Sequence, residues 1–434
     1  MKRLKVLISA HELSPKLGSE CGVGWNLVIR LAKYHDVTVL FAKTNQFGTS
    51  HYARDVENQI RENGPIPGVE FISIQQPFIT KIANQINKWI SFKEASTGFP
   101  PLYFLGYKYW QKAAYAEAKK LSRTQVFDLV HLVTAISYRE PGYLWKLSTP
   151  FVWGPTSGIF NTPMKFVGRD GFKALFIEFF RRASNFFNQF FSGRIARAIH
   201  RSAFIYPVST EDDSFFRKHG AKQTRILLEA GTLIFPGISI PENIVAPVSI
   251  VWCGRMVSSK GLNLFLQALN QCRFKSGEVA VKIIGGGPLM YSSQRLAKSL
   301  GINDIAWLGQ VPRDEVFSHL QHADILVHTS YKEATPNVVV EALSLGTAVI
   351  CHDAYGMSVA VNDTCGIKIP LISPKESIAG FSRAMSDLVA DPVRLRSLRL
   401  NALRRAKELS WDTVAERMAN DYLQICNRDE GSAN

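Results

Sequence analysis

Residues 331–342 read YKEATPNVVVEA and begin shortly after Asp324–His328, a short apolar run that is typical of a β-strand. Thr335 can cap a helix and Pro336 suits a first helical turn. Gly346 can end the same helix in a left-handed conformation. The stretch therefore predicts a strand, a tight loop and a helix in succession, which is the repeating unit of a parallel α/β sheet.

The same stretch carries two carboxylates. Glu333 falls in the loop at the N-terminus of the predicted helix, and Glu341 follows about a turn and a half inside it. Amides at a helix N-terminus attract phosphate oxygens. Ionised carboxylates only accept hydrogen bonds, so beside a phosphate site this pair predicts contacts with sugar hydroxyls.

Apolar runs alternate with helical stretches along the whole chain, which predicts two successive doubly wound units of the α/β class. The helical stretches include Gly24–Tyr34, Tyr103–Ser122 and Leu262–Cys272. The predicted strands are Lys5–Ala10, Asp36–Ala42, Glu70–Ile74, Asp128–Val133, Phe151–Gly154, Phe204–Val208, Ser249–Gly254, Ala280–Ile284, Ile305–Leu308, Asp324–His328 and Ala348–His352.

A linker separates the two units. Phe235–Val248 contains three prolines and lacks helical periodicity, so we place the boundary near residue 245. This gives a first domain over residues 1–245, a second over 246–408, and a closing helix with a polar tail over 409–434. Ligands of open parallel sheets bind beyond the carboxyl ends of the strands, so the loops after strands are the candidate site.

Two cations flank the first strand-to-helix turn of the second domain. Arg255 follows the strand Ser249–Gly254, and Lys260 opens the next helix. A guanidinium and an ammonium there can both reach a diphosphate, although two solvated loop cations are the simpler alternative. A second tight turn, centred on Gly286, follows the next strand and permits close backbone approach.

Composition narrows the class of protein. The chain has 434 residues, of which 46% are hydrophobic and 20% charged, as expected for a globular protein. The longest uncharged run, residues 147–164, holds three prolines and cannot be a spanning helix. The six cysteines show no metal-binding spacing. With no secretory signal either, we expect a cytoplasmic location.

Positive charge is concentrated in the first half. Residues 1–250 hold 31 basic and 18 acidic side chains, whereas residues 251–434 hold 20 and 18. The segment Lys165–Arg201 has eight Lys or Arg against two acids, interleaved with nine Phe at helical spacing. This pattern predicts an amphipathic helix on the inner face of an anionic membrane, unless the Phe residues pack in the core. Nucleic acid is disfavoured, because no recognition motif accompanies the basic segment.

The motifs together resemble the retaining glycosyltransferases of family 4, which have the two-domain GT-B fold. They are Gly254-Arg255, Lys260-Gly261, the glycines of residues 285–287, Leu308-Gly309, and the glutamates Glu333 and Glu341, which are separated by seven residues. The resemblance covers nearly the whole chain. It implies two Rossmann-like domains facing a central cleft and a C-terminal helix, Trp411–Ile425, that crosses back onto the first domain.

The resemblance also implies roles for individual residues. A nucleotide-sugar donor would be held mainly by the second domain, with Arg255 and Lys260 on its diphosphate in place of a metal ion, so neither metal nor cofactor is implied. Glu341 would take the ribose hydroxyls, and Glu333 would contact the sugar. The implied donor-binding residues are Gly22, Gly254, Gly286, Gln310, Val311, Thr335, Pro336, Asn337 and Glu341.

The first domain offers fewer signals. The turn around Gly22 follows the first strand and resembles the family's glycine-rich loop, whose amides would also address the diphosphate. His131 ends a strand where many members carry an active-site histidine, although a buried structural histidine is the alternative. Arg139 follows the same strand and is a candidate for acceptor binding. We assign catalysis to Arg255, Lys260, Glu333 and His131.

The predicted function is a retaining transfer of a sugar from a nucleotide diphosphate to a lipid-linked or saccharide acceptor, in the synthesis of a cell-surface polysaccharide, exopolysaccharide or lipopolysaccharide. Two alternatives remain open. One is a nucleotide-sugar 2-epimerase of the same fold. The other is a non-catalytic membrane-associated scaffold.

Overall fold

The structure is a computed structural model that describes residues 2–90, 98–168 and 172–431. The chain divides into two compact units. Unit 1 consists of Met1–Ile159, Phe186–Glu229 and Trp411–Asn434, and unit 2 consists of Phe160–Asn185 and Ala230–Ser410. Unit 2 thus begins ahead of the predicted boundary near residue 245 and also takes a segment from the first half of the chain.

Two hydrogen bonds of Thr232 explain why unit 2 begins ahead of the predicted boundary. The Thr232 amide donates to the Leu409 carbonyl at 2.9 Å, and the Thr232 hydroxyl donates to the Ala406 carbonyl at 2.5 Å. These bonds attach the first residues after Ala230 to the end of a helix in the same unit. The proline-rich stretch that we predicted as the linker therefore lies within unit 2.

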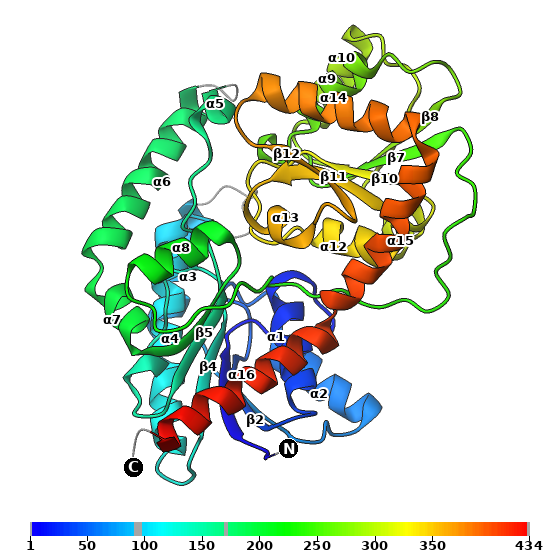
Figure 1. Cartoon of the computed structure of the whole chain (residues 1–434). Coiled ribbons are helices and arrows are strands. Elements are labelled where there is room, and N and C mark those ends of the chain that lie inside the picture. Colours follow the sequence, from blue (N-terminus) through cyan, green and yellow to red (C-terminus); the bar gives the residue numbers. More distant parts are fainter. Residues whose placement is uncertain (1, 91–97, 169–171, 432–434) are drawn as a thin grey trace. The chain divides into compact units, whose positions relative to one another are not determined.

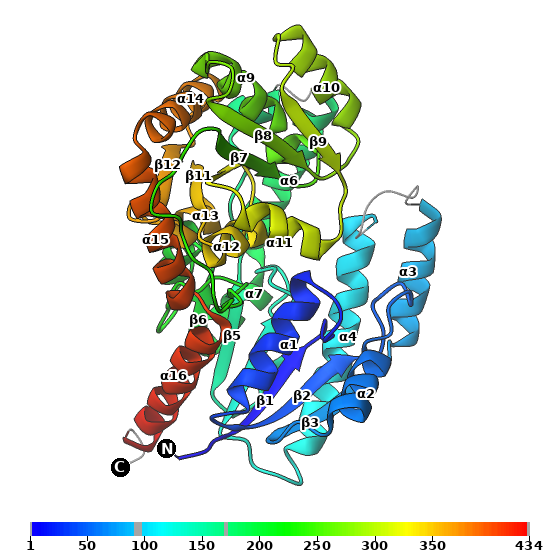
Figure 2. The ribbon, with the colours of Figure 1, turned by 90° about the vertical axis from the view of Figure 1, so that its right-hand side faces the viewer.

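Unit 1 is built on a six-stranded sheet with the order β3-β2-β1-β4-β5-β6, in which all described pairs are parallel (Figures 1 and 2). The strands are short and mostly buried because they are covered on both faces. Their bounds are β1 Lys5–Ala10, β2 Asp36–Ala42, β3 Val69–Ile74, β4 Leu129–Thr134, β5 Phe151–Thr156 and β6 Ser202–Pro207.

The C-terminal helix belongs to unit 1, where it packs on α1. Lys33, just after α1, pairs with Asp412 at 2.6 Å, and His35 contacts the Ala419 carbonyl at 3.2 Å. The helices of this unit are α1 Ser19–Leu31, α2 Tyr52–Asn63, α3 Phe78–Ile90, α4 Pro100–Leu121, α7 Gly193–Arg201, α8 Thr210–Lys218 and α16 Trp411–Gly431, and the short 3₁₀ turn η1 is Leu144–Lys146.

Unit 2 repeats the parallel arrangement with the order β12-β11-β10-β7-β8-β9. The edge strand β12 was not predicted, because Gly366–Pro370 is short and ends in proline. The strands are β7 Val248–Cys253, β8 Val279–Ile284, β9 Ile305–Gly309, β10 Ile325–His328, β11 Ala348–Asp353 and β12 Gly366–Pro370.

Helices cover both faces of the unit 2 sheet. Figure 1 shows α9 and α14 on one face and α12 and α13 on the other. The core on the first face includes the fully buried Trp252, Phe265 and Phe381. The helices are α5 Met164–Val167, α9 Leu262–Cys272, α10 Met290–Ser299, α11 Arg313–Gln321, α12 Asn337–Ser344, α13 Tyr355–Ala360, α14 Pro374–Ala390 and α15 Pro392–Glu408, together with the 3₁₀ turn η3 Ser258–Lys260. One further helix, α6 Phe172–Phe191, has residues in both units.

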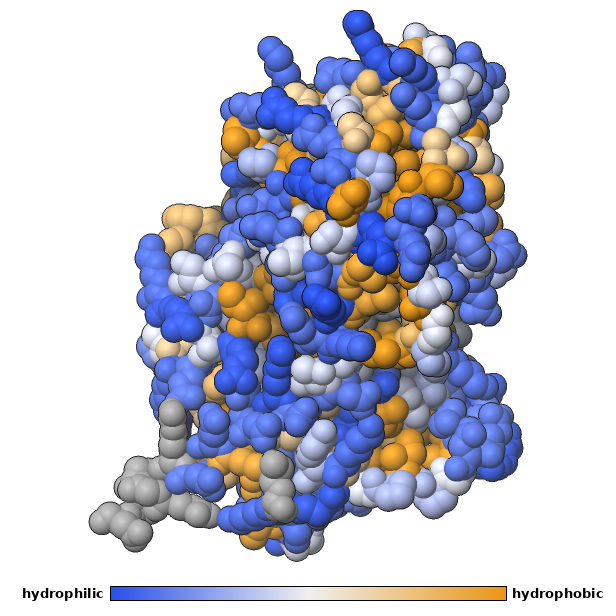
Figure 3. Space-filling view, turned by 45° about the vertical axis from the view of Figure 1, so that its right-hand side comes forward, coloured by the Kyte–Doolittle hydropathy of each residue, from blue (hydrophilic) through white to orange (hydrophobic). Residues whose placement is uncertain are grey.

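Among the described residues, every helix is too short or too polar to cross a membrane. The face of the molecule in Figure 3 is mainly hydrophilic, with hydrophobic residues in smaller groups between the polar ones.

Candidate functional site

We call the predicted diphosphate-binding cations, Arg255 and Lys260, the clamp. The loop that carries the clamp and the loop that carries Glu333 meet where the strand order of unit 2 reverses. Strands β7 and β10 are neighbours in the sheet although two strands separate them in sequence. Strand β7 leads into the turn that bears Lys260, and β10 leads into the loop that bears Glu333. Ligands of doubly wound sheets bind at such a switch point, beyond the carboxyl ends of the strands.

Backbone contacts fix these two loops against each other. The Tyr331 amide donates to the Ser259 carbonyl at 3.0 Å, and the Ser330 hydroxyl donates to the same carbonyl at 3.1 Å. Gly261 has φ +70°, and a Cβ there would overlap the Thr329 carbonyl oxygen. The close approach of the loops therefore requires glycine at position 261.

One of the two predicted diphosphate-binding cations, Lys260, is in direct contact with a predicted carboxylate. Lys260 forms an ion pair with Glu333, and the Ser330 hydroxyl donates to the same carboxylate at 3.1 Å. The buried His328 ring lies below, with Nε2 3.7 Å from Glu333 Oε2. Burial opposes ionisation of Glu333, but the contact with His328 and the charge of Lys260 outweigh it and lower its pKa to about 2.

This pKa shift predicts a pH-dependent contribution to stability. The folded-state pKa of Glu333 lies below its ordinary value of 4.5, so the contribution is present above that value and is lost as the pH falls toward 2. We expect Glu333→Gln to lower the free energy of unfolding by roughly 2 kcal/mol at pH 7, and by much less at pH 3. Urea unfolding at both pH values measures this. Glu416→Gln, at an exposed position of α16, is the control, and a loss that is larger at pH 3 would contradict the assignment.

The predicted glycine turns come together next to this pair. The Met256 amide donates to the Gly286 carbonyl at 2.8 Å, and the Gly285 amide donates to the Gly309 carbonyl at 2.7 Å. A Cβ on Gly286 would lie 3.8 Å from the Cβ of Gln310. The turn at Gly286 and the residue predicted to contact the base are therefore neighbours, at the ends of β8 and β9.

The second predicted carboxylate has a partner that the sequence analysis missed. Arg313 donates to Glu341 at 2.8 Å. Burial raises the pKa of Glu341, and the charge of Arg313 opposes this. Burial and the nearby Glu341 raise the pKa of Cys253 to about 12, so this thiol is protonated at neutral pH. Arg313 follows Val311 by two positions, but this spacing alone does not indicate the contact with Glu341.

The helix after Glu333 begins later than predicted. Thr335 is not its cap: α12 starts at Asn337, and Pro336 occupies the N-cap position without a side-chain hydrogen bond. The Val339 and Val340 amides donate to the Pro336 carbonyl at 3.0 and 3.2 Å. Thr335 is buried in the loop instead, where Gly356 of α13 packs on the preceding peptide.

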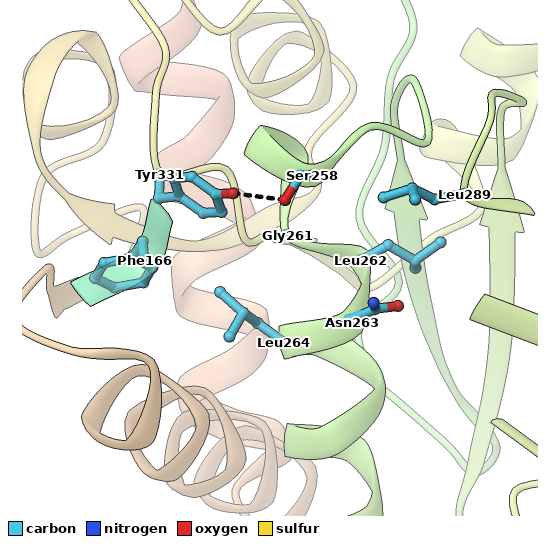
Figure 4. Close-up of a pocket in the computed structure, with 8 residues that line it drawn as sticks. All are labelled: Phe166, Ser258, Gly261, Leu262, Asn263, Leu264, Leu289 and Tyr331. Carbon is cyan, nitrogen blue, oxygen red and sulfur yellow. Dashed lines mark hydrogen bonds between the residues drawn. The ribbon is translucent and has the colours of Figure 1, made fainter. Parts of the chain in front are cut away.

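A pocket of about 430 Å³ in unit 2 is lined partly by Ser258 and Gly261 of the same turn (Figure 4). Its walls include Phe166, Leu264 and Tyr331, and the Tyr331 and Ser258 hydroxyls are 2.8 Å apart. Arg255, in contrast, is exposed on the loop that precedes the turn. The residues that flank Lys260 therefore line a partly apolar pocket, and Lys260 itself pairs with Glu333.

His131 has the environment of a structural histidine. It is fully buried in unit 1; Nε2 lies 2.6 Å from the Gly154 carbonyl and Nδ1 2.6 Å from the Tyr422 hydroxyl. Burial lowers the pKa of His131 to about 3, and the bond to Gly154 opposes this. A neutral ring donates through Nε2 and accepts through Nδ1, so both nitrogens are used. This geometry favours the structural alternative over the catalytic one.

Gly22 lies in the first turn of helix α1 rather than in a loop, and this turn presents carboxyl groups as well as amides. The Gly22 amide donates to the Gly18 carbonyl at 3.5 Å, inside the turn. Burial raises the pKa of the neighbouring Glu20 well above its ordinary value, and Glu12 and Glu229 raise it further. Protonated or not, these carboxyl groups are better partners for hydroxyl groups than for a diphosphate.

The remaining first-domain candidate, Arg139, is half-buried on the segment after β4. Its guanidinium carbon lies 5.9 Å from the centre of the Tyr138 ring, and its carbonyl accepts from Arg194 at 2.9 Å. These contacts lie within unit 1, and its acceptor-binding role stays a prediction.

The Phe-rich helix α6 does not bury its aromatic face. Phe176, Phe179, Phe180, Phe187, Phe190 and Phe191 are all more than half exposed, so the alternative in which they pack in the core is wrong for these residues. Some of the cations are structural: Arg181 pairs with Glu178 at 2.5 Å and Arg194 with Glu140 at 2.7 Å. Arg169 and the side chains of Phe172 and Lys173 lie outside the described residues.

Within the part of the chain that the structure describes, no group of three or more His, Cys, Asp or Glu side chains is arranged to hold a metal ion.

The two parallel six-stranded units and the helix that returns to the first of them define the GT-B class. A solved structure with this architecture, HepE of Anabaena in complex with UDP and glucose, has a TM-score of 0.57 and 15% identity and covers 97% of this chain and 100% of its own. Residues 243–408 match the family described as glycosyl transferases group 1.

Two curated relatives are similar to part of the chain. D-inositol 3-phosphate glycosyltransferase of Streptomyces bingchenggensis is 29% identical over 43% of this chain. GDP-mannose-dependent alpha-(1-6)-phosphatidylinositol monomannoside mannosyltransferase of Mycolicibacterium smegmatis is 26% identical over 39%. The matched regions span 42% and 46% of the length of these relatives.

Proposed function

We propose that this protein is a retaining glycosyltransferase that moves a sugar from a nucleotide-diphosphate donor to a lipid-linked or saccharide acceptor. The observation that carries the proposal is the contact of Lys260 with Glu333 at the switch point of unit 2. A cation for the diphosphate and an ionised carboxylate for the sugar hydroxyls are thereby held side by side. A match to group 1 glycosyl transferases over the same unit supports this reading.

The donor roles follow from the two loops. Lys260 and Arg255 stabilise the charge that develops on the departing diphosphate, without a metal ion. Glu333 and the segment Thr335–Asn337 contact the sugar. Glu341 accepts from the ribose hydroxyls, and the backbone near Gln310-Val311 meets the base.

The bond changes are those of a same-face substitution. The bond from the anomeric carbon to the diphosphate oxygen breaks, and a bond to the acceptor oxygen forms on the same face. The acceptor proton passes to the departing phosphate oxygen, so no protein nucleophile is required. The turn that carries Gly22 and Glu20 supplies hydroxyl-binding groups for the acceptor, and Arg139 is a second candidate.

Similar proteins suggest the chemical classes of the substrates. HepE was solved with UDP and glucose, and one relative transfers mannose to a phosphatidylinositol mannoside. We therefore propose a lipid-linked acceptor in the synthesis of a cell-surface polysaccharide. In this proposal the enzyme works on the inner face of the cytoplasmic membrane, which it contacts through Lys165–Arg201.

A donor panel tests the proposal. We expect one nucleotide-diphosphate sugar to raise the melting temperature, because a ligand that binds only the folded state stabilises it. With that donor, release of nucleoside diphosphate is expected to depend on added acceptor. Conversion of the donor sugar without an acceptor would indicate an epimerase instead. The absence of a thermal shift with every donor would indicate a scaffold.

A further inference from the structure

Helix α3 (Phe78–Ile90) has the opposite burial pattern to an ordinary surface helix, which buries its apolar side chains and exposes its polar ones. Its buried side is polar or small: Thr80, Ala83, Asn84 and Asn87 are the buried residues. Its exposed side carries large apolar side chains, of which Trp89 is 86% and Phe78 75% exposed. The exposed apolar residues are Phe78, Ile79, Ile82, Ile86, Trp89 and Ile90.

Hydrogen bonds lock the helix in this orientation. The Thr80 hydroxyl donates to the Gly106 carbonyl of α4 at 2.9 Å, and the Asn84 amide group donates to the Gln46 carbonyl at 2.5 Å. Asn87 accepts from the Phe99 amide at 2.6 Å. Rotating the helix to hide its apolar face would leave these buried polar groups without partners, which is costly.

The close contact with α4 adds to this constraint. A Cβ on Gly106 would lie 3.2 Å from the Thr80 methyl group and 3.3 Å from the Asn84 side-chain oxygen. The absence of a side chain at Gly106 therefore lets the polar side of α3 rest directly on α4. The apolar face is a fixed feature of unit 1.

Basic residues predominate in the sequence around α3. Between Glu70 and Glu117 the sequence contains five lysines and a single acid, Glu94. On α3 itself the charged residues are Lys81 and Lys88, and both are exposed. Two copies of this face would repel each other, whereas an anionic surface would attract it.

We propose that α3 is an interfacial helix that inserts its apolar face into an anionic lipid bilayer. Apolar and aromatic side chains on one face, with lysines and no acid on the helix, are the features of helices that lie in the plane of a membrane. Trp89 near the end of the helix would sit at the headgroup level, as interfacial tryptophans do. This site is separate from α6, and it does not depend on the proposed donor chemistry.

Vesicle sedimentation of the full chain tests the proposal. We expect binding to vesicles that contain about 30% phosphatidylglycerol in phosphatidylcholine, and weak binding to pure phosphatidylcholine, since basic residues near an anionic surface are attracted to it. Ile86→Ser with Trp89→Ser should reduce binding more than tenfold, because two large apolar side chains would no longer be buried in the bilayer.

Matched variants separate this helix from the rest of the surface. Tyr291→Ser, at an exposed position of α10, should bind like the wild type. Trp89→Phe keeps the apolar face and should bind, but it should lose the blue shift of tryptophan emission that vesicles induce in the wild type. Phe187→Ser with Phe190→Ser reports on α6 separately.

Two results would overturn the proposal. One is unchanged vesicle binding by the Ile86→Ser, Trp89→Ser protein with its melting temperature intact. The other is a wild-type dimer in sedimentation velocity that this variant dissociates, because the face would then bind a second copy. Donor-induced thermal shifts are expected to be the same in all these variants, so failure here is distinguishable from failure of the proposed function.

Discussion

Replacing Lys260 or Arg255 by alanine is expected to lower turnover by on the order of a hundredfold, because each side chain stabilises charge that develops on the departing diphosphate. The loss should appear in the rate of acceptor-dependent release of nucleoside diphosphate. Lys260→Ala should have the larger effect of the two. It also removes the ion-pair partner of Glu333, whereas Arg255 is exposed on the preceding loop.

Melting temperatures separate the two consequences of Lys260→Ala. We expect this variant to be less stable than the wild type, because the Glu333 carboxylate would keep its buried position without its cation. Arg255→Ala should melt like the wild type and lose activity only. Lys298→Ala, which removes an exposed cation from α10, is the control and should keep both properties. Turnover near wild type in both clamp variants would remove the assignment of these residues.

Most strands could be predicted because each is a short apolar run between turn residues. Strand β2 (Asp36–Ala42) was predicted with its observed bounds. The edge strand β12 was not predicted, because an edge strand needs less apolar sequence than a central strand. Gly366–Pro370 accordingly has few apolar residues. The division into units was harder, because it depends on contacts such as Thr232 with Leu409, which are distant in sequence.

The candidate site could be predicted only as far as its residues follow strands. Position after a strand indicated Lys260 and Glu333, and these are in contact. The same rule indicated His131, but it could not show that Gly154 and Tyr422 occupy both ring nitrogens. Arg313 and His328 were missed, because their importance comes from contacts with Glu341 and Glu333 that spacing alone does not reveal.

Gly356→Ala is expected to disrupt the donor loop, the segment between β10 and α12 that bears Glu333. Residue 356 is not part of this loop. A Cβ at this position of α13 would overlap the Ala334 carbonyl oxygen and lie 2.8 Å from the Ala334 carbonyl carbon. These are backbone atoms and cannot rotate away as the end of a side chain could. The peptide that follows Glu333 would have to move, and the helix N-terminus at Asn337 would move with it.

We expect two effects of this single methyl group. The free energy of unfolding should fall by about 3 kcal/mol, at the upper end of what overpacking costs, because the clash is with backbone. The donor-induced thermal shift should also disappear, because the Glu333 carboxylate and the N-terminus of α12 would no longer be correctly placed to bind the same donor. Gly193→Ala is the matched control: a Cβ there meets no atom within 4 Å, and position 193 begins α7. Alanine is a better helix former than glycine, so this control should be neutral or slightly stabilising. If Gly356→Ala unfolds and responds to donor like Gly193→Ala, then the packing of α13 on the Ala334 peptide does not position the donor loop.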